Sequence, residues 1–216
     1  MSTENAFSSM GSVPPCTIYL LRHGVIQSPG EGRYYIGWQD LPLSGAGRRQ
    51  AHAWSDYFVS RSLDRIYCSD LVRCLETARI IATRCSLQPQ AMSELREVCL
   101  GQWEGRRFDA VRAADPGEFQ RRGDSIAGHR PPGGESFDDL QHRAWPVFAQ
   151  LASSGHRSII TVTHAGVIRV LLCRLLGMPL KNLFSIELDY GALSIINFGP
   201  KGFRVRAVNL PPPGAQ

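Results

Sequence analysis

The chain has 216 residues, of which 43% are hydrophobic, and it carries a formal net charge of +5. One domain with a single core fits this length and composition, and no apolar run reaches the roughly 18–20 residues that cross a bilayer. The positive charge favours an anionic partner, but the arginines form no run with interleaved aromatic residues of the kind that indicates nucleic-acid binding.

Apolar segments and turn residues predict strands and helices in alternation along the chain. The predicted strands cover residues 17–21, 65–68, 158–163, 184–188, 194–198 and 203–208. The predicted helices run from Ser44 to about Ser60, from a cap at Ser69 or Asp70 through Ala82, over 108–114, over 117–122, from Ser136 through Leu151 with a kink at Pro146, and over 165–176. This alternation indicates an α/β fold, a three-layer α/β/α sandwich around a mostly parallel central sheet.

The two ends of the chain and one inner segment differ from this pattern. Residues 1–15 and 211–216 lack periodicity and are rich in serine or proline, so we expect disordered tails around a single domain at 16–210. A polar, irregular segment near 102–130 predicts a cap over that domain. The long loop at 25–43 is of the kind that carries function in a compact protein.

Six cysteines lie at irregular spacing, with no C-x-x-C pair and no cysteine–histidine cluster. This pattern predicts reduced thiols and no metal site. The N-terminus has no basic region followed by an apolar stretch, which is the pattern of a secretory signal. We therefore expect a soluble, cytoplasmic protein with no membrane partner.

Two histidines follow predicted strands directly. Arg22-His23-Gly24 ends the strand at 17–21, and Thr163-His164-Ala165-Gly166 ends the strand at 158–163. Because ligands collect at the carboxyl ends of parallel strands, the two histidines can converge on one small site. The arginine before His23 and the glycines after both histidines favour an anion such as a phosphoryl group. The remaining histidines are interpreted as ordinary core, capping or surface residues.

Other kinds of site are less compatible with these residues. Asp40 or Glu97 could complete a metal site with the histidines, but the permanently charged Arg22 would repel a divalent cation. The chain has no G-x-S-x-G motif of a serine hydrolase and no Walker loop of a nucleotide hydrolase. Arg73, just past the second predicted strand, is a further cation that could reach the same sheet edge.

The chain resembles the histidine phosphatase superfamily in six motifs that occur in order between residue 17 and about residue 170. They are Arg22-His23-Gly24; Gly37-Trp38-Gln39-Asp40-Leu41-Pro42-Leu43-Ser44 with Gly47; Ser69-Asp70-Leu71-x-Arg73-x-x-x-Thr77-Ala78; Leu95-x-Glu97-x-x-x-Gly101-x-Trp103-Glu104-Gly105; Pro132-Gly133-Gly134-Glu135-Ser136; and Thr163-His164-Ala165-Gly166. Each motif alone is short, but six in the family's order are specific.

The resemblance implies a phosphoglycerate mutase-like fold and a phosphohistidine mechanism without a cofactor or a metal. His23 would attack phosphorus, and water would then hydrolyse the phosphorylated histidine. Arg22, Arg73 and His164 would clamp the phosphoryl oxygens, and Glu97 would be the general acid. By the same resemblance, we expect substrate contacts from Arg22, Arg73, Gly37, Trp38, Gln39, His164 and Ala165.

Residue chemistry alone leaves two of these assignments open. It does not distinguish His23 from His164 as the nucleophile, and it makes Glu94 an equal candidate for the acid. The loop at 25–41 and the cap at 102–130 are where we expect the specificity for the leaving group.

Departures from the family pattern favour a phosphatase over a mutase. Val25 stands where many members have Glu or Gln, Pro29 where mutases have an asparagine, and Leu100 where mutases have a tyrosine. The compact length and the Pro-Gly-Gly-Glu-Ser turn are similar to bacterial members of the α-ribazole phosphatase type. We expect a phosphomonoester hydrolase for a small phosphorylated metabolite, with α-ribazole phosphate as a candidate substrate. The alternatives are a phosphoglycerate mutase and a non-catalytic phosphate-binding module, and the C-terminal strands offer an edge for a homodimer.

Overall fold

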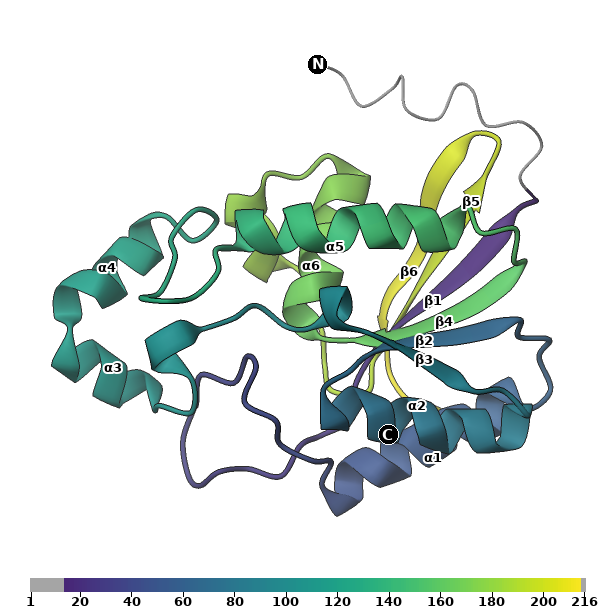
Figure 1. Cartoon of the computed structure of the whole chain (residues 1–216), viewed down its shortest axis with the longest axis horizontal. Coiled ribbons are helices and arrows are strands. Elements are labelled where there is room, and N and C mark those ends of the chain that lie inside the picture. The colour runs from purple at the N-terminus through teal and green to yellow at the C-terminus, as the bar shows by residue number, and fades with distance from the viewer. Residues whose placement is uncertain (1–13, 215–216) are drawn as a thin grey trace.

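The computed structural model describes residues 14–214 and contains a central sheet between helices (Figure 1). The strands are β1 (Cys16–Arg22), β2 (Arg65–Ser69), β3 (Pro89–Met92), β4 (Ser158–Thr163), β5 (Leu193–Gly199) and β6 (Gly202–Leu210). The α-helices are α1 (Gly45–Phe58), α2 (Val72–Cys85), α3 (Phe108–Ala114), α4 (Pro116–Asp124), α5 (Phe137–Ala152) and α6 (Ala165–Leu176). Short 3₁₀ helices cover Ser93–Leu95, Gly101–Trp103 and Leu180–Ser185. Of the two predicted tails, residues 1–13 and 215–216 lie outside the described residues, whereas residues 14–15 and 211–214 are described.

The sheet has the strand order β3-β2-β4-β1-β5-β6 and is mostly parallel, as predicted. The neighbouring pairs from β3 to β1 are parallel, whereas β5 runs antiparallel to both β1 and β6. The register places Arg22 of β1 beside Thr163 of β4. His23 and His164, the next residue of each strand segment, therefore leave the sheet side by side.

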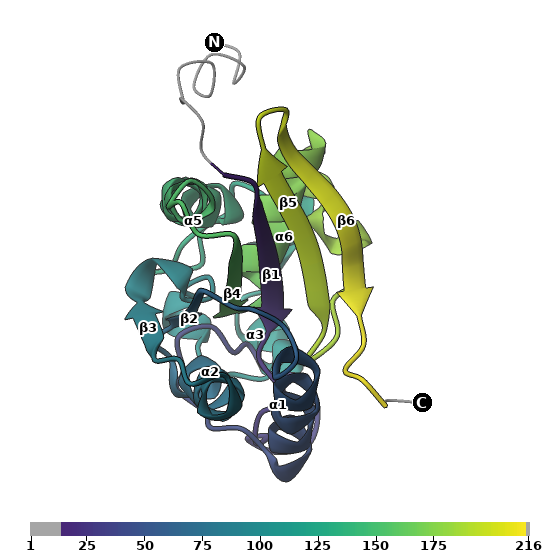
Figure 2. The same cartoon turned by 90° about the vertical axis from the view of Figure 1, so that its right-hand side faces the viewer.

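Each face of the sheet is covered by a different pair of helices. Ile18 and Leu20 of β1 belong to the core cluster that includes residues of α5 and α6. Leu21, which points to the other face, packs in a second cluster with Trp54 and Phe58 of α1 and with residues of α2. Figure 2 shows α1 and α2 lying beside each other on the far side of the sheet from α5. Burial on both faces explains why β1 and β4 are continuous apolar runs.

Side-chain caps begin several helices where the sequence predicts them. The Ser44 hydroxyl accepts a hydrogen bond from the Gly47 N–H at the start of α1, and Ser136 and Asp139 form a capping box on α5. The helix α5 continues through Pro146 to Ala152.

The predicted cap of α2 at Ser69 or Asp70 is wrong. Leu71 is the N-cap residue and has no side-chain cap bond, while the carboxylate of Asp40, from the loop before α1, accepts the Val72 N–H at 2.7 Å. Asp70 instead receives two hydrogen bonds from the Arg96 guanidinium. Sequence reasoning looked for the cap next to the helix and missed a donor–acceptor pair separated by more than one element.

Two strand predictions differ from the structure. Residues 184–188 alternate apolar and polar side chains but are no strand, because the segment after Pro179 turns into the 3₁₀ helix Leu180–Ser185. Conversely, β3 was not predicted. It is a short edge strand with no fully buried residue, so it lacks the apolar run that marked the inner strands.

The predicted cap corresponds to α3 and α4, which project beyond the carboxyl ends of the parallel strands in Figure 1. The loop before α1 lies against this cap, because Tyr34 forms an isolated β-bridge with Arg107. Aromatic stacking joins the same two segments, since the rings of Tyr35 and Phe108 lie 3.9 Å apart and nearly parallel. Cap and loop together therefore border the sheet edge where His23 and His164 emerge.

Candidate active site

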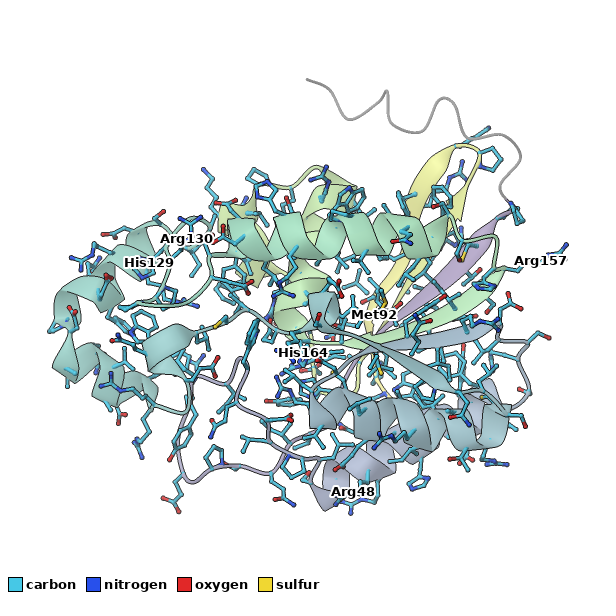
Figure 3. All side chains as sticks on the ribbon, viewed as in Figure 1. Arg48, Met92, His129, Arg130, Arg157 and His164 are labelled. Carbon is cyan, nitrogen blue, oxygen red and sulfur yellow. The ribbon has the colours of Figure 1, made fainter. Side chains whose placement is uncertain are left out.

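The carboxyl ends of β1, β2 and β4 bring together the residues that the sequence singled out. His23 follows β1, Arg73 lies in the first turn of α2 after β2, and His164 is the N-cap residue of α6 after β4. Figure 3 shows His164 at this junction between the sheet and α6. The parallel strand order thus converts three distant sequence positions into one site.

His23 is buried and held as a neutral ring with a defined tautomer. Its Nδ1 lies 2.9 Å from the carbonyl oxygen of Gly24, which can only accept, so Nδ1 carries the proton. Burial lowers the pKa of His23 well below 6.5, and the charges of Arg73 and Arg22 lower it further. The Nε2 atom therefore keeps an unprotonated lone pair at neutral pH.

The backbone around His23 is fixed from three directions. The His23 N–H donates to the Thr163 carbonyl at 3.0 Å, and its own carbonyl accepts the Gly191 N–H at 3.0 Å. Gly24 lies so close to α1 that a Cβ at this position would be 2.5 Å from the carbonyl oxygen of Gly47. The glycine after His23 is needed for this close approach and does more than provide flexibility.

His164 lies against His23, with the two ring centroids 5.1 Å apart. Its Nε2 is 2.9 Å from the Ser69 hydroxyl, and its Nδ1 is 3.3 Å from Nε of Arg73. Burial, followed by the charge of Arg73, lowers the pKa of His164 well below 6.5. Ser69 was predicted only as a possible helix cap, and its contact with His164 depends on the pairing of β2 with β4.

Arg73 is only 1% exposed, and all three of its guanidinium nitrogens have acceptors. Besides the contact with His164, Nη1 donates to the Gln39 carbonyl at 2.9 Å and Nη2 to the Gly37 carbonyl at 2.6 Å. The predicted residues at 37–39 thus contact Arg73 through the main chain. The Trp38 side chain contacts the segment of Glu97 instead, because its Nε1 donates to the Glu97 carbonyl at 2.7 Å.

The loop that holds Arg73 is itself held by Glu104, a residue to which sequence reasoning gave no role. The Glu104 carboxylate accepts the N–H groups of Gly37, Trp38, Gln39 and Leu100 at 2.7–3.1 Å. Its presence in a family motif was the only sequence signal. Four converging backbone donors make it the organising acceptor of this loop.

Arg22 extends toward the C-terminal part of the chain. Its Nη1 donates to the Leu188 carbonyl at 2.6 Å, and its guanidinium carbon lies 3.7 Å from the ring centroid of Tyr190. Its Nε is buried and, within residues 14–214, has no hydrogen-bond partner. An uncompensated buried donor at this position is suited to an anionic ligand.

Glu97 is held by the loop of the second histidine. One of its carboxylate oxygens accepts the Gly166 N–H at 3.0 Å, and the other accepts the Val98 N–H at 2.9 Å. Any Cβ at Gly166 would overlap the Glu97 carboxylate. The competing candidate Glu94 is exposed and bonds to Ser93. The structure therefore brings Glu97, and not Glu94, to the histidines.

Arg22 and Glu97 border a cleft of about 250 Å³, together with Ala165 and Gly166, the two residues that follow His164. Its other walls are largely aromatic and include Tyr34, Tyr35, Phe108, Phe137, Phe184 and Tyr190. Two further arginines, Arg122 of α4 and Arg169 of α6, also line it. Sequence analysis gave neither arginine a role. Their shared position became visible only in the fold.

The described part of the chain holds no group of three or more His, Cys, Asp or Glu side chains arranged to bind a metal ion. Asp40, the acid that could have joined the histidines, bonds instead to the start of α2. Among the same residues, no helix is both long enough and apolar enough to cross a membrane.

Comparisons with known proteins agree with this geometry. A profile of the histidine phosphatase superfamily, branch 1, matches residues 18–211. The adenosylcobalamin/α-ribazole phosphatase of Escherichia coli K12 is 30% identical over 193 residues, which cover 89% of this chain and 95% of that protein. A glucosyl-3-phosphoglycerate phosphatase of Mycolicibacterium vanbaalenii is 34% identical over 76% of each chain. The crystal structure of a putative α-ribazole-5′-P phosphatase from Escherichia coli is similar with a TM-score of 0.84 and 29% identity, over 93% of this chain and 99% of that one.

Proposed function

The chain belongs to branch 1 of the histidine phosphatase superfamily and is a phosphatase, and on this premise we propose that His23 is its nucleophile. The observation that carries the proposal is the placement of the His23 ring, which is buried and has its Nδ1 2.9 Å from the carbonyl oxygen of Gly24. This arrangement leaves Nε2 as the free nucleophilic atom. The His164 ring lies beside it, with the two ring centroids 5.1 Å apart.

In the first step, the Nε2 lone pair of His23 forms a bond to phosphorus while the bond from phosphorus to the leaving oxygen breaks. Protonated Glu97 gives its proton to that oxygen, so the alcohol leaves as a neutral molecule. In the second step, the Glu97 carboxylate takes a proton from water, and the water oxygen attacks phosphorus. This attack releases inorganic phosphate from His23 and returns Glu97 to its protonated form.

Arg22, Arg73 and His164 are the proposed clamp for the phosphoryl oxygens. The unpartnered Nε of Arg22 supports this role, because a phosphoryl oxygen would supply its missing acceptor. Arg73 adds a charge whose position is fixed by the Gly37 and Gln39 carbonyls. Such preorganised donors stabilise the charge that spreads over the phosphoryl oxygens in the transition state. Four residues support this clamp from the loop before α1 and from the start of α6: Gly37, Trp38, Gln39 and Ala165.

A small phosphorylated metabolite is the proposed substrate, and the reaction is hydrolysis and not the internal transfer of a mutase. The printed names of the relatives supply two candidates, α-ribazole phosphate and glucosyl-3-phosphoglycerate. The aromatic walls of the cleft suit a leaving group that presents an apolar or planar face. No step of this mechanism requires a metal or an organic cofactor.

We also propose a cytoplasmic homodimer built from one domain at 16–210 with its cap near 102–130. The six cysteines, all unpaired, suit a reducing compartment. The edge strand β6 carries the exposed apolar side chains of Val208 and Leu210. An edge of this kind can pair with a second copy of the chain.

The direct test is hydrolysis of 4-nitrophenyl phosphate in the presence of EDTA, by the wild type and by the His23→Ala variant. We expect activity in the wild type and a loss of about a thousandfold or more in the variant, since the covalent route is removed. Equal turnover by the two proteins would contradict the proposal. Incubation with 3-phosphoglycerate, with and without a bisphosphoglycerate primer, should give inorganic phosphate and no 2-phosphoglycerate.

A further inference from the structure

Two arginines in the wall of the cleft have no part in the proposed reaction. Arg122 projects from α4 in the cap, and Arg169 projects from α6, just over one turn after His164. Both line the same cleft as Arg22 and Glu97. They approach it from different elements, so their meeting is a consequence of the tertiary fold.

Arg169 uses only part of its hydrogen-bonding capacity. Its Nε donates to the Ile186 carbonyl at 2.9 Å, and its guanidinium carbon lies 5.2 Å from the ring centroid of Phe184. Within the described residues, no carboxylate oxygen lies within 4.0 Å of its guanidinium. Burial lowers its pKa, while the more distant Glu97 raises it. Its two terminal nitrogens therefore remain available to a ligand.

Arg122 lies near aromatic rings and, in the part of the chain that the structure describes, forms no ion pair with an acid. Its guanidinium carbon lies 5.7 Å from the ring centroid of Tyr35 and 5.9 Å from that of Phe137. Burial lowers the pKa of Arg122, because the charged form loses hydration in the cleft. Its neighbour Arg121 differs in each respect, since it is exposed and pairs with Glu118 at 3.1 Å.

The charges that line the cleft do not balance. Arg22, Arg122 and Arg169 are present, and among residues 14–214 Glu97 is the only acidic residue in the lining. The charge of Arg169 also contributes to lowering the pKa of Arg22, after the larger effect of burial. A phosphoryl group bound by Arg22 and Arg73 would leave Arg122 and Arg169 without a counter-charge. Both side chains are half-buried, and cations that lose part of their hydration in this way are normally paired.

We propose that Arg122 and Arg169 form a second anion subsite, which binds a carboxylate or a second phosphate on the leaving group of the substrate. The inference rests on the proposed function, because it places the scissile phosphoryl group at His23 and the second anion farther out in the cleft. The proposed subsite distinguishes between the candidate substrates. It favours a phosphate ester whose leaving group carries a negative charge. The leaving group of α-ribazole phosphate is neutral, so this ester would be bound less well.

A matched pair of ligands tests the subsite. Glycerol 3-phosphate and 3-phosphoglycerate differ in one position, where the second carries a carboxylate in place of a hydroxymethyl group. Calorimetric binding to the His23→Ala variant, which cannot turn the ligands over, measures recognition alone. We expect 3-phosphoglycerate to bind about tenfold more tightly or better, as charge-assisted hydrogen bonds to arginine provide. Glycerol 1,3-bisphosphate, in a third arm, shows whether a phosphate is accepted in place of the carboxylate.

Variants then connect the preference to the two arginines. In the Arg122→Gln and Arg169→Gln double variant, the preference for 3-phosphoglycerate should fall to within about twofold of unity, while Arg122→Lys should retain part of it. Arg121→Gln is the matched control and should keep the wild-type preference. Thermal unfolding of each variant checks that the cap remains folded.

The outcomes separate the subsite from the reaction. If the binding preference is absent, or persists unchanged in the double variant, the subsite is overturned even when the wild type hydrolyses phosphate esters. If the preference is present and depends on the two arginines, the subsite stands. Failure of the wild type on 4-nitrophenyl phosphate would count against the nucleophile assignment instead, because that substrate does not use the second anion site.

Discussion

The proposed phosphoryl end of the site, at His23, Arg73 and His164, and the proposed outer end, at Arg122 and Arg169, are built in different ways. At the phosphoryl end, His23, Arg73 and His164 are buried, follow parallel strands, and are held by backbone carbonyls and a hydroxyl. At the outer end, Arg122 comes from the cap and lies near the rings of Tyr35 and Phe137, whereas Arg169 comes from α6 and lies near the ring of Phe184. The first region is rigid and generic, which suits a group common to all phosphate esters. The second has no part in the proposed reaction, so it is where selectivity should change without loss of the chemistry.

Glu97 lines the same cleft as Arg122 and Arg169 and bonds to Gly166 near His164, and it gives the largest of the remaining effects. In Glu97→Gln, no proton reaches the leaving oxygen, so hydrolysis of an alkyl phosphate should slow by about a hundredfold or more. A 4-nitrophenolate leaves without protonation, so the loss on 4-nitrophenyl phosphate should be clearly smaller. Steady-state kcat on both substrates measures the difference.

The exposed Glu94→Gln variant is the control, and we expect it to behave as the wild type on both substrates. Equal losses by Glu97→Gln on the alkyl and aryl esters would show that Glu97 only shapes the site and does not act as its general acid.

Glu104 tests whether the rigidity of the phosphoryl end depends on the loop at 37–39. A glutamine at 104 presents an amide group to two of the four backbone N–H donors that the carboxylate now accepts. We expect the free energy of unfolding to fall by about 2 kcal/mol and kcat to fall by about tenfold, because Arg73 loses its fixed carbonyl partners. Urea denaturation and steady-state kinetics measure the two effects.

Glu76→Gln, on the outer side of α2, should change the free energy of unfolding by less than about 0.5 kcal/mol. If Glu104→Gln leaves both stability and kcat at the wild-type level, the loop does not support Arg73 in the way described.

The smallest expected effect is the pH dependence of stability. The pKa values of His23 and His164 are lowered well below 6.5, first by burial, whereas in the unfolded chain they return to about 6.5. Below pH 6.5 the unfolded chain therefore takes up protons that the folded chain does not. The free energy of unfolding should be fully retained above pH 6.5 and should decline as the pH falls toward the lowered values.

Urea denaturation at pH 7.5, 6.0 and 5.0 measures this decline. We expect it to be smaller in His23→Gln and in His164→Gln than in the wild type, whereas replacing the exposed His52 should leave it unchanged. A decline of the same size in all of these proteins would place its origin outside the phosphoryl end.

Sequence reasoning predicted that His23 and His164 would come together, because the signals for this are local. His23 and His164 each follow a continuous apolar run, and parallel strands bring such ends together. The family motifs then separated the two histidines and selected Glu97 over Glu94. The roles of Ser69 and Glu104 were missed, because they depend on strand pairing and on a loop that returns from the other side of the site.

The outer end was not predictable for a related physical reason. Arg122 and Arg169 look like surface residues of two amphipathic helices, and only the docking of the cap gives them a common cleft. Similar non-local effects explain why one strand was predicted wrongly and another was missed. The strand predicted at 184–188 follows Pro179 and a 3₁₀ turn, and the unpredicted β3 is a short edge strand that gains its order from pairing with β2.

Trapping of the phosphorylated enzyme tests the central assignment most directly. Wild-type protein mixed with a ³²P-labelled phosphate ester and quenched within milliseconds should carry label that is labile to acid and stable to base, as expected of phosphohistidine. Peptide mapping should place this label on His23, and the His23→Ala variant should carry none. Label on His164, or equal labelling of the His23→Ala variant, would contradict the account.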